Sequence, residues 1–190
     1  MGGEIALAVA SRAIENARVV ALFDEYAERA SRLAETLEPT PAVYRTMDDL
    51  LTDQDVSIVV ECAAPAAVAA HATAVLSEGR SLLTLSSGAL ADTGLFESMI
   101  RIAAENRCDI LIPSGALGGI DAIRSVRDLL QSVTLTSTKP PAAFSGAPGF
   151  AKWEGVGVAE ATVLYEGPAG DAVALFPANV NVAATLSVAG

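Results

Sequence analysis

Short apolar runs alternate with helical patterns over the first 113 residues of the chain. Apolar residues that recur three and four positions apart predict helices over residues 5–17, 25–37, 48–51, 66–78 and 94–106. Compact runs rich in Val, Ile and Leu predict strands over residues 18–23, 42–45, 56–61, 81–85 and 110–112. Strands that alternate with helices favour a doubly wound parallel sheet with right-handed crossovers, so the predicted fold class is α/β.

The pattern changes after residue 118. Helices are predicted over residues 120–130, 171–176 and 183–189, and alternating apolar and polar positions predict strands over residues 133–138 and 161–166. Residues 142–157 are rich in Gly, Ala and Pro and are expected to form a long loop. We therefore expect two domains, one over residues 1–113 and one over residues 114–190.

Polar or reactive side chains follow several of the predicted strands. Parallel sheets of this kind bind ligands beyond the carboxyl ends of their strands, where this chain places Asp24, Cys62, Ser86 and Ser114. We expect Cys62 to line a pocket and not to act as a nucleophile, because no His is paired with it. Ser86 and Ser87 either donate hydrogen bonds to a cofactor or cap the following helix.

The first predicted helix begins almost at residue 3, and no strand precedes it. Gly2 is placed like the last glycine of a G-x-G-x-x-G dinucleotide fingerprint, and Asp24 follows at about the 20-residue spacing of the ribose-binding acid. A carboxylate there favours NAD over NADP, because it repels a 2′-phosphate. The alternative interpretation is a flexible terminus for Gly2 and an ordinary helix cap for Asp24.

The stretch over residues 109–123 joins a predicted strand to a predicted helix through small residues, among them Gly115, Gly118 and Gly119. Such a turn lets a ligand approach the backbone, and the helix N-terminus offers free N–H groups. The alternative is a tight turn in which glycine only relieves steric strain.

Composition narrows the function classes. The formal net charge is −11, which argues against nucleic acid as a partner. Neither a long apolar stretch nor a signal-peptide pattern is present, so we expect no membrane partner and a cytoplasmic location. Cys62 and Cys108 lie far apart, which favours a reducing compartment over a disulfide framework or a zinc site. The single histidine, His71, lies in an Ala-rich helix and is interpreted as structural.

Several motifs occur in one characteristic order. They are VVECAAPAAV at residues 59–68, LSSGALAD at 85–92, PSGALGGIDAI at 113–123, TKPP at 138–141 and FPANVNVAATL at 176–186. With these motifs the chain resembles the L-aspartate dehydrogenase family over nearly its whole length. The resemblance implies a Rossmann-like domain followed by an α/β substrate domain with a mixed sheet. It further implies a homodimer, L-aspartate as substrate and NAD or NADP as cofactor.

The resemblance also assigns residues. Ala116 and Asn181 match cofactor contacts of the family, with Asn179 as the other possible register. Gly2 matches the end of the nucleotide fingerprint and Asp24 the ribose-binding acid. A cation at Lys139, in the family's KPP segment, suits a dicarboxylate substrate. The alternative for Lys139 is a solvated strand end.

Two departures from the family pattern are expected. The family's first strand is missing, and its catalytic His lies downstream of residues 176–186, so no catalytic residue is assigned here. The chain is therefore either an aspartate dehydrogenase whose ends are cut or a catalytically silent nucleotide-binding or dimerising paralogue. A third interpretation is a different Rossmann oxidoreductase that acts on amino or hydroxy acids.

Overall fold

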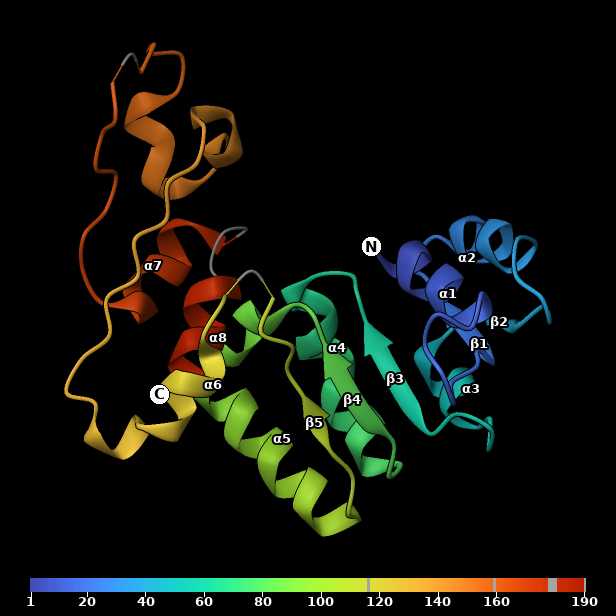
Figure 1. Cartoon of the computed structure of the whole chain (residues 1–190). Coiled ribbons are helices and arrows are strands. Elements are labelled where there is room, and N and C mark those ends of the chain that lie inside the picture. The colour runs from blue at the N-terminus through green and yellow to red at the C-terminus, as the bar shows by residue number, and fades with distance from the viewer. Residues whose placement is uncertain (116, 159, 178–180, 190) are drawn as a thin grey trace. The chain divides into compact units, whose positions relative to one another are not determined.

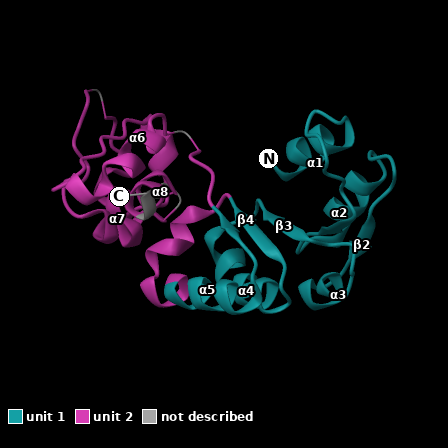
Figure 2. Cartoon of the chain, turned by 60° about the horizontal axis from the view of Figure 1, so that its bottom comes forward, with its two compact units in different colours: residues 1–84, 97–111 teal, residues 85–96, 112–190 magenta. Residues whose placement is uncertain are grey.

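The computed structural model describes residues 1–115, 117–158, 160–177 and 181–189. The chain divides into two compact units, one of residues 1–84 and 97–111 and one of residues 85–96 and 112–190 (Figure 2). The second unit therefore includes residues 85–96, a segment that the sequence analysis placed in the N-terminal domain. Among the described residues, no helix has both the length and the apolar character needed to cross a bilayer.

All strand pairs of the first unit are parallel, as predicted. One sheet pairs β1 (Ala21–Phe23) with β2 (Ala42–Tyr44), and the other has the order β3 (Ile58–Glu61), β4 (Ser81–Thr84), β5 (Ile110–Leu111) (Figure 1). No strand among the described residues pairs β1 with β3. In the doubly wound order 3-2-1-4-5-6, strand 1 lies between these two neighbours. The sheet is thus divided at the position where the sequence analysis expects the family's first strand.

The helices of this unit follow the predicted ones closely. They are α1 (Gly2–Ala10), α2 (Ala27–Ala34), α3 (Met47–Leu51), α4 (Pro65–Ser77) and, from residue 97 onward, α5 (Thr93–Asn106). The prediction that the first helix continues to residue 17 is wrong. The helix stops at Ala10, and the following turn holds Arg12 and Asn16 at φ of 59° and 60°, in the left-handed region that a helix cannot contain.

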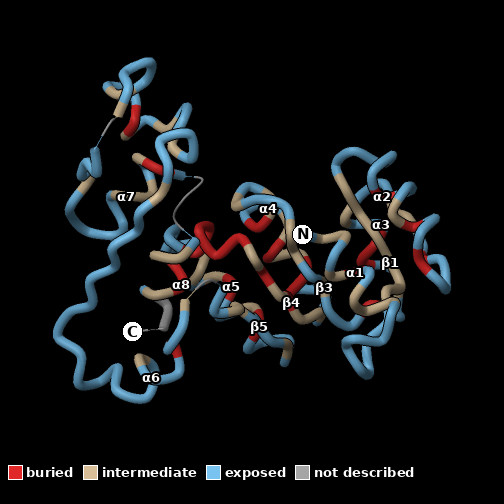
Figure 3. The backbone as a smooth tube through the Cα atoms, turned by 45° about the horizontal axis from the view of Figure 1, so that its top comes forward, coloured by how far each residue is buried: buried red, intermediate tan, exposed pale blue. Residues whose placement is uncertain are grey.

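Local sequence explains where α4 begins and ends. Pro65 occupies its first turn, where a missing N–H costs nothing, and Gly79 follows its end at φ +68°. Four residues at helical spacing form its buried face, namely Val68, Ala72, Val75 and Leu76. Figure 3 shows buried residues along β4 and in the segment that follows it, where residues 86–90 are all buried.

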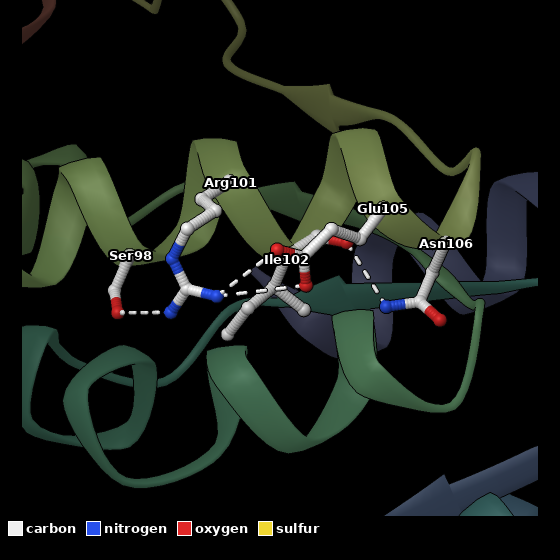
Figure 4. A network of polar contacts seen from close by, with 5 residues as sticks. All are labelled: Ser98, Arg101, Ile102, Glu105 and Asn106. Atoms are coloured by element: carbon white, nitrogen blue, oxygen red, sulfur yellow. Dashed lines mark hydrogen bonds and ion pairs between the residues drawn. The ribbon is translucent and has the colours of Figure 1, made fainter.

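The outer face of α5 is polar and its inner face is apolar. Arg101 pairs with Glu105 one turn later at 3.2 Å, and the Asn106 amide donates to the Ile102 carbonyl at 3.0 Å (Figure 4). Such an exposed ion pair contributes about 0.5 kcal/mol or less. Met99 and Ala103 are buried on the other side, and their burial anchors the helix.

The second unit consists of short helices joined by extended segments. Its elements are the 3₁₀ helices η1 (Ser87–Ala91), η2 (Arg127–Leu129), η3 (Pro141–Phe144) and η4 (Pro148–Trp153), and the α-helices α6 (Ile120–Ser125), α7 (Ala169–Leu175) and α8 (Asn181–Ala189). The helix predicted over residues 120–130 is divided into α6 and η2, because Val126 adopts a non-helical conformation.

The strands predicted over residues 133–138 and 161–166 do not form, and the described part of this unit contains no sheet. Both segments have an alternating pattern, but no described strand pairs with either of them. An isolated strand gains neither ladder hydrogen bonds nor an apolar surface to cover its own. Val163, on the second segment, is accordingly 74% exposed. The mixed sheet implied by the resemblance is therefore absent from the described residues.

Aromatic rings form the core of the loop region in the second unit. The Phe176 ring centroid lies 5.7 Å from that of Phe144 and 6.4 Å from that of Tyr165, and Phe150 lies 6.0 Å from Phe144. Phe150 and Phe176 are buried. These rings fold the predicted Gly- and Pro-rich loop into η3 and η4.

Candidate cofactor site

Gly2 and Cys62, two of the predicted cofactor residues, lie close together in the first unit. Gly2 opens α1, and Cys62 directly follows β3. A Cβ built on Gly2 would lie 3.5 Å from the Cys62 Cβ, so the start of the helix packs closely against the carboxyl end of the strand. Close packing of a helix against a strand is also what the third glycine of a dinucleotide fingerprint permits.

Cys62 is half-buried and protonated at neutral pH. Burial raises the pKa of its thiol, and the neighbouring Glu61 carboxylate raises it further. A neutral thiol is a weak nucleophile, which agrees with its interpretation as a lining residue.

A polar contact that sequence reasoning missed joins two strands at the same end of the sheet. The hydroxyl of Thr84, which is fully buried, donates to Glu61 Oε2 at 2.8 Å. Glu61 Oε1 accepts from the Ala63 N–H at 2.7 Å. Glu61 and Thr84 are register partners of β3 and β4, and this register is not encoded in either strand alone. Their contact fixes the loop that leads to Cys62.

Asp24 lies directly after β1, at the end where its predicted role requires it. Its Oδ1 accepts from the Tyr26 N–H at 2.8 Å, so the residue also supports the start of α2. Its other carboxylate oxygen forms no hydrogen bond within the described residues. Both interpretations of Asp24, as a cap and as a ligand for a ribose, are thus compatible in one side chain.

A hollow at the start of α2 has both cationic and anionic side chains in its lining. The Arg29 guanidinium lies 4.3 Å from the centroid of the Tyr26 ring, a cation–π contact. A hollow of about 450 Å³ is lined by Tyr26, Ala27, Glu28, Arg29 and Arg32. Sequence reasoning assigned none of these residues, although the basic residues at helical spacing along α2 were a visible signal.

Asn181, a predicted cofactor contact in the second unit, is the first residue of α8. Its Oδ1 accepts from the Gly88 N–H at 2.8 Å, and its Nδ2 donates to the Leu85 carbonyl at 3.4 Å. The Ser87 hydroxyl donates to the Asn181 carbonyl at 2.9 Å. Ser87 therefore neither caps the following helix nor stays free for a ligand; it binds α8.

The remaining predicted residues are placed as follows. Lys139 is half-buried in the extended segment before η3. Ala116 and Asn179 lie outside the described residues. Gly115 and Gly119 adopt φ of +60° and +75°, so the turn before α6 needs glycine for its backbone conformation.

In the part of the chain that the structure describes, no three His, Cys, Asp or Glu residues lie together in a group that could hold a metal ion. His71 packs edge-on against the Phe23 ring, with centroids 5.8 Å apart, as a structural residue does.

Comparison with known proteins supplies the family. Residues 121–190 match the family model of the aspartate dehydrogenase C-terminal domain, and residues 1–113 match the NAD-binding domain model of homoserine dehydrogenase. The chain is 40% identical over its full length to L-aspartate dehydrogenase of Methanosarcina barkeri, covering 70% of that protein. It is 36% identical to the enzyme of Nitrosopumilus maritimus, with the same coverage of both chains.

A solved structure shows the same fold. The crystal structure of aspartate dehydrogenase from Thermotoga maritima matches 90% of this chain and 72% of its own length, with a TM-score of 0.68 and 27% identity. The parallel strand pairs, the two family models and the full-length relatives agree. The chain belongs to the aspartate dehydrogenase family.

Proposed function

We propose that this chain binds NAD or NADP and serves the oxidation of L-aspartate to iminoaspartate. The imine then hydrolyses to oxaloacetate and ammonia or enters pyridine nucleotide biosynthesis. The observation that carries the proposal is the close approach of Gly2 to Cys62 at the carboxyl end of β3. Relatives named L-aspartate dehydrogenase match the whole chain and support the choice of substrate.

The first unit offers the groups that a dinucleotide needs. The N-terminus of α1, a helix of nine residues, presents backbone N–H groups and a positive dipole end for a pyrophosphate. The free oxygen of Asp24 would accept from a ribose hydroxyl, and Cys62 would line the pocket without reacting. When bound, the nicotinamide supplies the hydride acceptor.

In the second unit we assign Asn181 to the cofactor and Lys139 to a substrate carboxylate. A cation is useful there, because L-aspartate is a dianion at its side chain and main-chain carboxylates and the chain as a whole is strongly acidic. We assign Ala116 to the cofactor on the family pattern alone. A homodimer in the cytoplasm completes the proposal.

No residue is assigned as the base that takes the amine proton. His71 packs edge-on against Phe23 and is not assigned to this role; the second candidate is a chain that binds the dinucleotide without turnover.

Two measurements on the 190-residue chain test the proposal and separate the candidates. Titration calorimetry with NAD and NADP measures binding, and absorbance at the reduced-nicotinamide band measures turnover with L-aspartate. D-aspartate, homoserine and malate serve as control substrates. Binding with L-aspartate-specific turnover supports the dehydrogenase, and binding alone supports the silent paralogue. Absence of binding to either cofactor refutes both, and preference for homoserine or malate indicates a different oxidoreductase.

A further inference from the structure

A chain of hydroxyl groups connects η1 to α8 inside the second unit. Ser87 Oγ lies 2.9 Å from the Asn181 carbonyl oxygen and 2.8 Å from Thr185 Oγ1. Ser87 is 3% exposed and Thr185 is 8% exposed, whereas Asn181 itself is exposed. Two buried hydroxyls thus hold the end of a helix whose first side chain faces solvent.

The direction of each hydrogen bond follows from proton counting. A carbonyl oxygen only accepts, so Ser87 must donate its single hydroxyl proton to Asn181. Ser87 has no second proton for Thr185, and therefore Thr185 donates to Ser87. The hydroxyl protons of Ser87 and Thr185 are therefore both donated in hydrogen bonds. Removal of either hydroxyl leaves a buried polar atom without its partner.

The same loop also holds the Asn181 carboxamide from its other side. The Gly88 N–H donates to Oδ1 at 2.8 Å, and the Leu85 carbonyl accepts from Nδ2. The hydroxyl chain holds the backbone of Asn181, and the two loop contacts hold its side chain. Neither set involves a residue outside the loop over 85–88 or outside α8.

We propose that Ser87 and Thr185 are positioning residues that fix the orientation of the Asn181 carboxamide for the dinucleotide. The inference rests on the proposed function, in which Asn181 contacts the cofactor. Ser87 and Thr185 act only through Asn181 and are not catalytic residues. Without these hydroxyl contacts, the carboxamide keeps its two loop contacts, but the backbone that carries it loses its anchor to the loop.

Two pairs of variants of the full chain separate positioning from folding. Thr185→Val removes the hydroxyl and keeps the shape, whereas Thr185→Ser keeps the hydroxyl and removes the methyl. Ser87→Ala removes the central hydroxyl, and Ser187→Ala, in α8, removes an exposed hydroxyl that donates to the Ala183 carbonyl of the same helix. The dissociation constant of NADH is measured by calorimetry, and circular dichroism verifies that each variant is fully folded at that temperature.

We expect Thr185→Val and Ser87→Ala to raise the dissociation constant about five- to tenfold, as expected for one lost buried hydrogen bond. Thr185→Ser and Ser187→Ala should stay within about twofold of the parent chain. The double variant Ser87→Ala with Thr185→Val should bind about as weakly as Ser87→Ala alone, because both act in one chain of bonds.

The outcomes separate this inference from the proposed function. If the parent chain binds NADH and all folded variants bind equally well, the positioning role is wrong and the proposed function stands. If Thr185→Ser weakens binding as much as Thr185→Val, shape and not the hydroxyl is responsible, and the inference is again wrong. If the parent chain binds no dinucleotide, both are wrong.

Discussion

At the scale of single residues, the proposed role of Asp24 predicts a preference between the two dinucleotides. One oxygen of its carboxylate accepts from the Tyr26 N–H at the start of α2, and we propose that the other accepts from a ribose hydroxyl. Replacement by Asn retains an acceptor for Tyr26 and removes the charge that repels a 2′-phosphate. We expect Asp24→Asn to weaken NAD binding about tenfold and to strengthen NADP binding, measured by calorimetry.

Arg29 is the reason to expect stronger NADP binding in the Asp24→Asn variant. Its guanidinium lies on the Tyr26 ring, in the helix that follows Asp24, and we expect it to attract a 2′-phosphate bound near Asp24. Asp55→Asn is the matched control, because Asp55 pairs with Arg18 on the exposed surface. An equal effect of both substitutions on both cofactors would refute the role of Asp24.

The raised pKa of Cys62 leads to a prediction for the pH dependence of its alkylation. Burial first and Glu61 second raise the pKa of this thiol, and only the thiolate reacts with iodoacetamide. Below its pKa the thiol is neutral, so its alkylation rate should rise with pH to a midpoint above that of a free cysteine. Mass spectrometry of the modified peptide follows the rate.

The same alkylation experiment, repeated with NADH present, tests whether the cofactor binds next to Cys62. NADH should slow the alkylation of Cys62 and leave that of Cys108 unchanged, since Cys108 is a half-buried residue between α5 and β5 and its raised pKa has burial as its main cause. Equal protection of both thiols would indicate a general change in stability and not a ligand at Cys62.

Site residues could be predicted from the sequence where their position depends on a neighbouring segment. They could not be predicted where their position depends on contacts between segments far apart in the sequence. Asp24 and Cys62 follow apolar runs, and a strand end is visible in the sequence. The Ser87–Asn181 contact spans 94 positions, and the register of Glu61 with Thr84 depends on two strands that fold together. Such contacts need tertiary structure.

At the scale of elements, η4 depends on one glycine. A Cβ on Gly149 would lie within 2.8 Å of the Phe176 Cε1 and Cε2 atoms, so a methyl group there overlaps a buried ring. Overpacking of this kind costs about 1–3 kcal/mol. We expect Gly149→Ala to lower the free energy of unfolding by about 2 kcal/mol in urea titrations.

Gly170 provides the control for this prediction. It lies in α7, where a built Cβ has no neighbour within 4 Å. Alanine favours a helix over glycine, so Gly170→Ala should leave stability unchanged or raise it by about 1 kcal/mol or less. A stable Gly149→Ala would mean that the aromatic rings rearrange freely.

Helices and strands could be predicted where the signals that determine them lie within one segment of the sequence. α4 has a buried face at helical spacing, a proline at its start and a glycine after its end, and all three are readable in order. The alternation over residues 133–138 is equally regular, yet strand formation also requires a partner strand. Periodicity thus indicates which face an element would bury but not whether a partner covers it.

At the scale of the whole molecule, a charge of −11 opposes the approach of two anionic ligands. Exposed charges interact over about 10 Å at 0.1 M salt, so added salt screens the repulsion before contact. We expect the association rate constant of NADH to rise about two- to threefold between 20 and 200 mM NaCl, measured by stopped-flow fluorescence.

Cations near the proposed site would have the opposite effect on the association rate constant. Its salt dependence shows whether these cations or the net charge dominate. Arg29 and Arg32 line the hollow at the start of α2, and a ligand steered by them would bind more slowly as salt increases. Sodium sulfate at equal ionic strength controls for specific ion effects. A rise in rate means that the net charge governs the encounter and that the cations act only at contact. A fall means that the hollow attracts the cofactor from a distance, and that the acidic surface has no part in its approach.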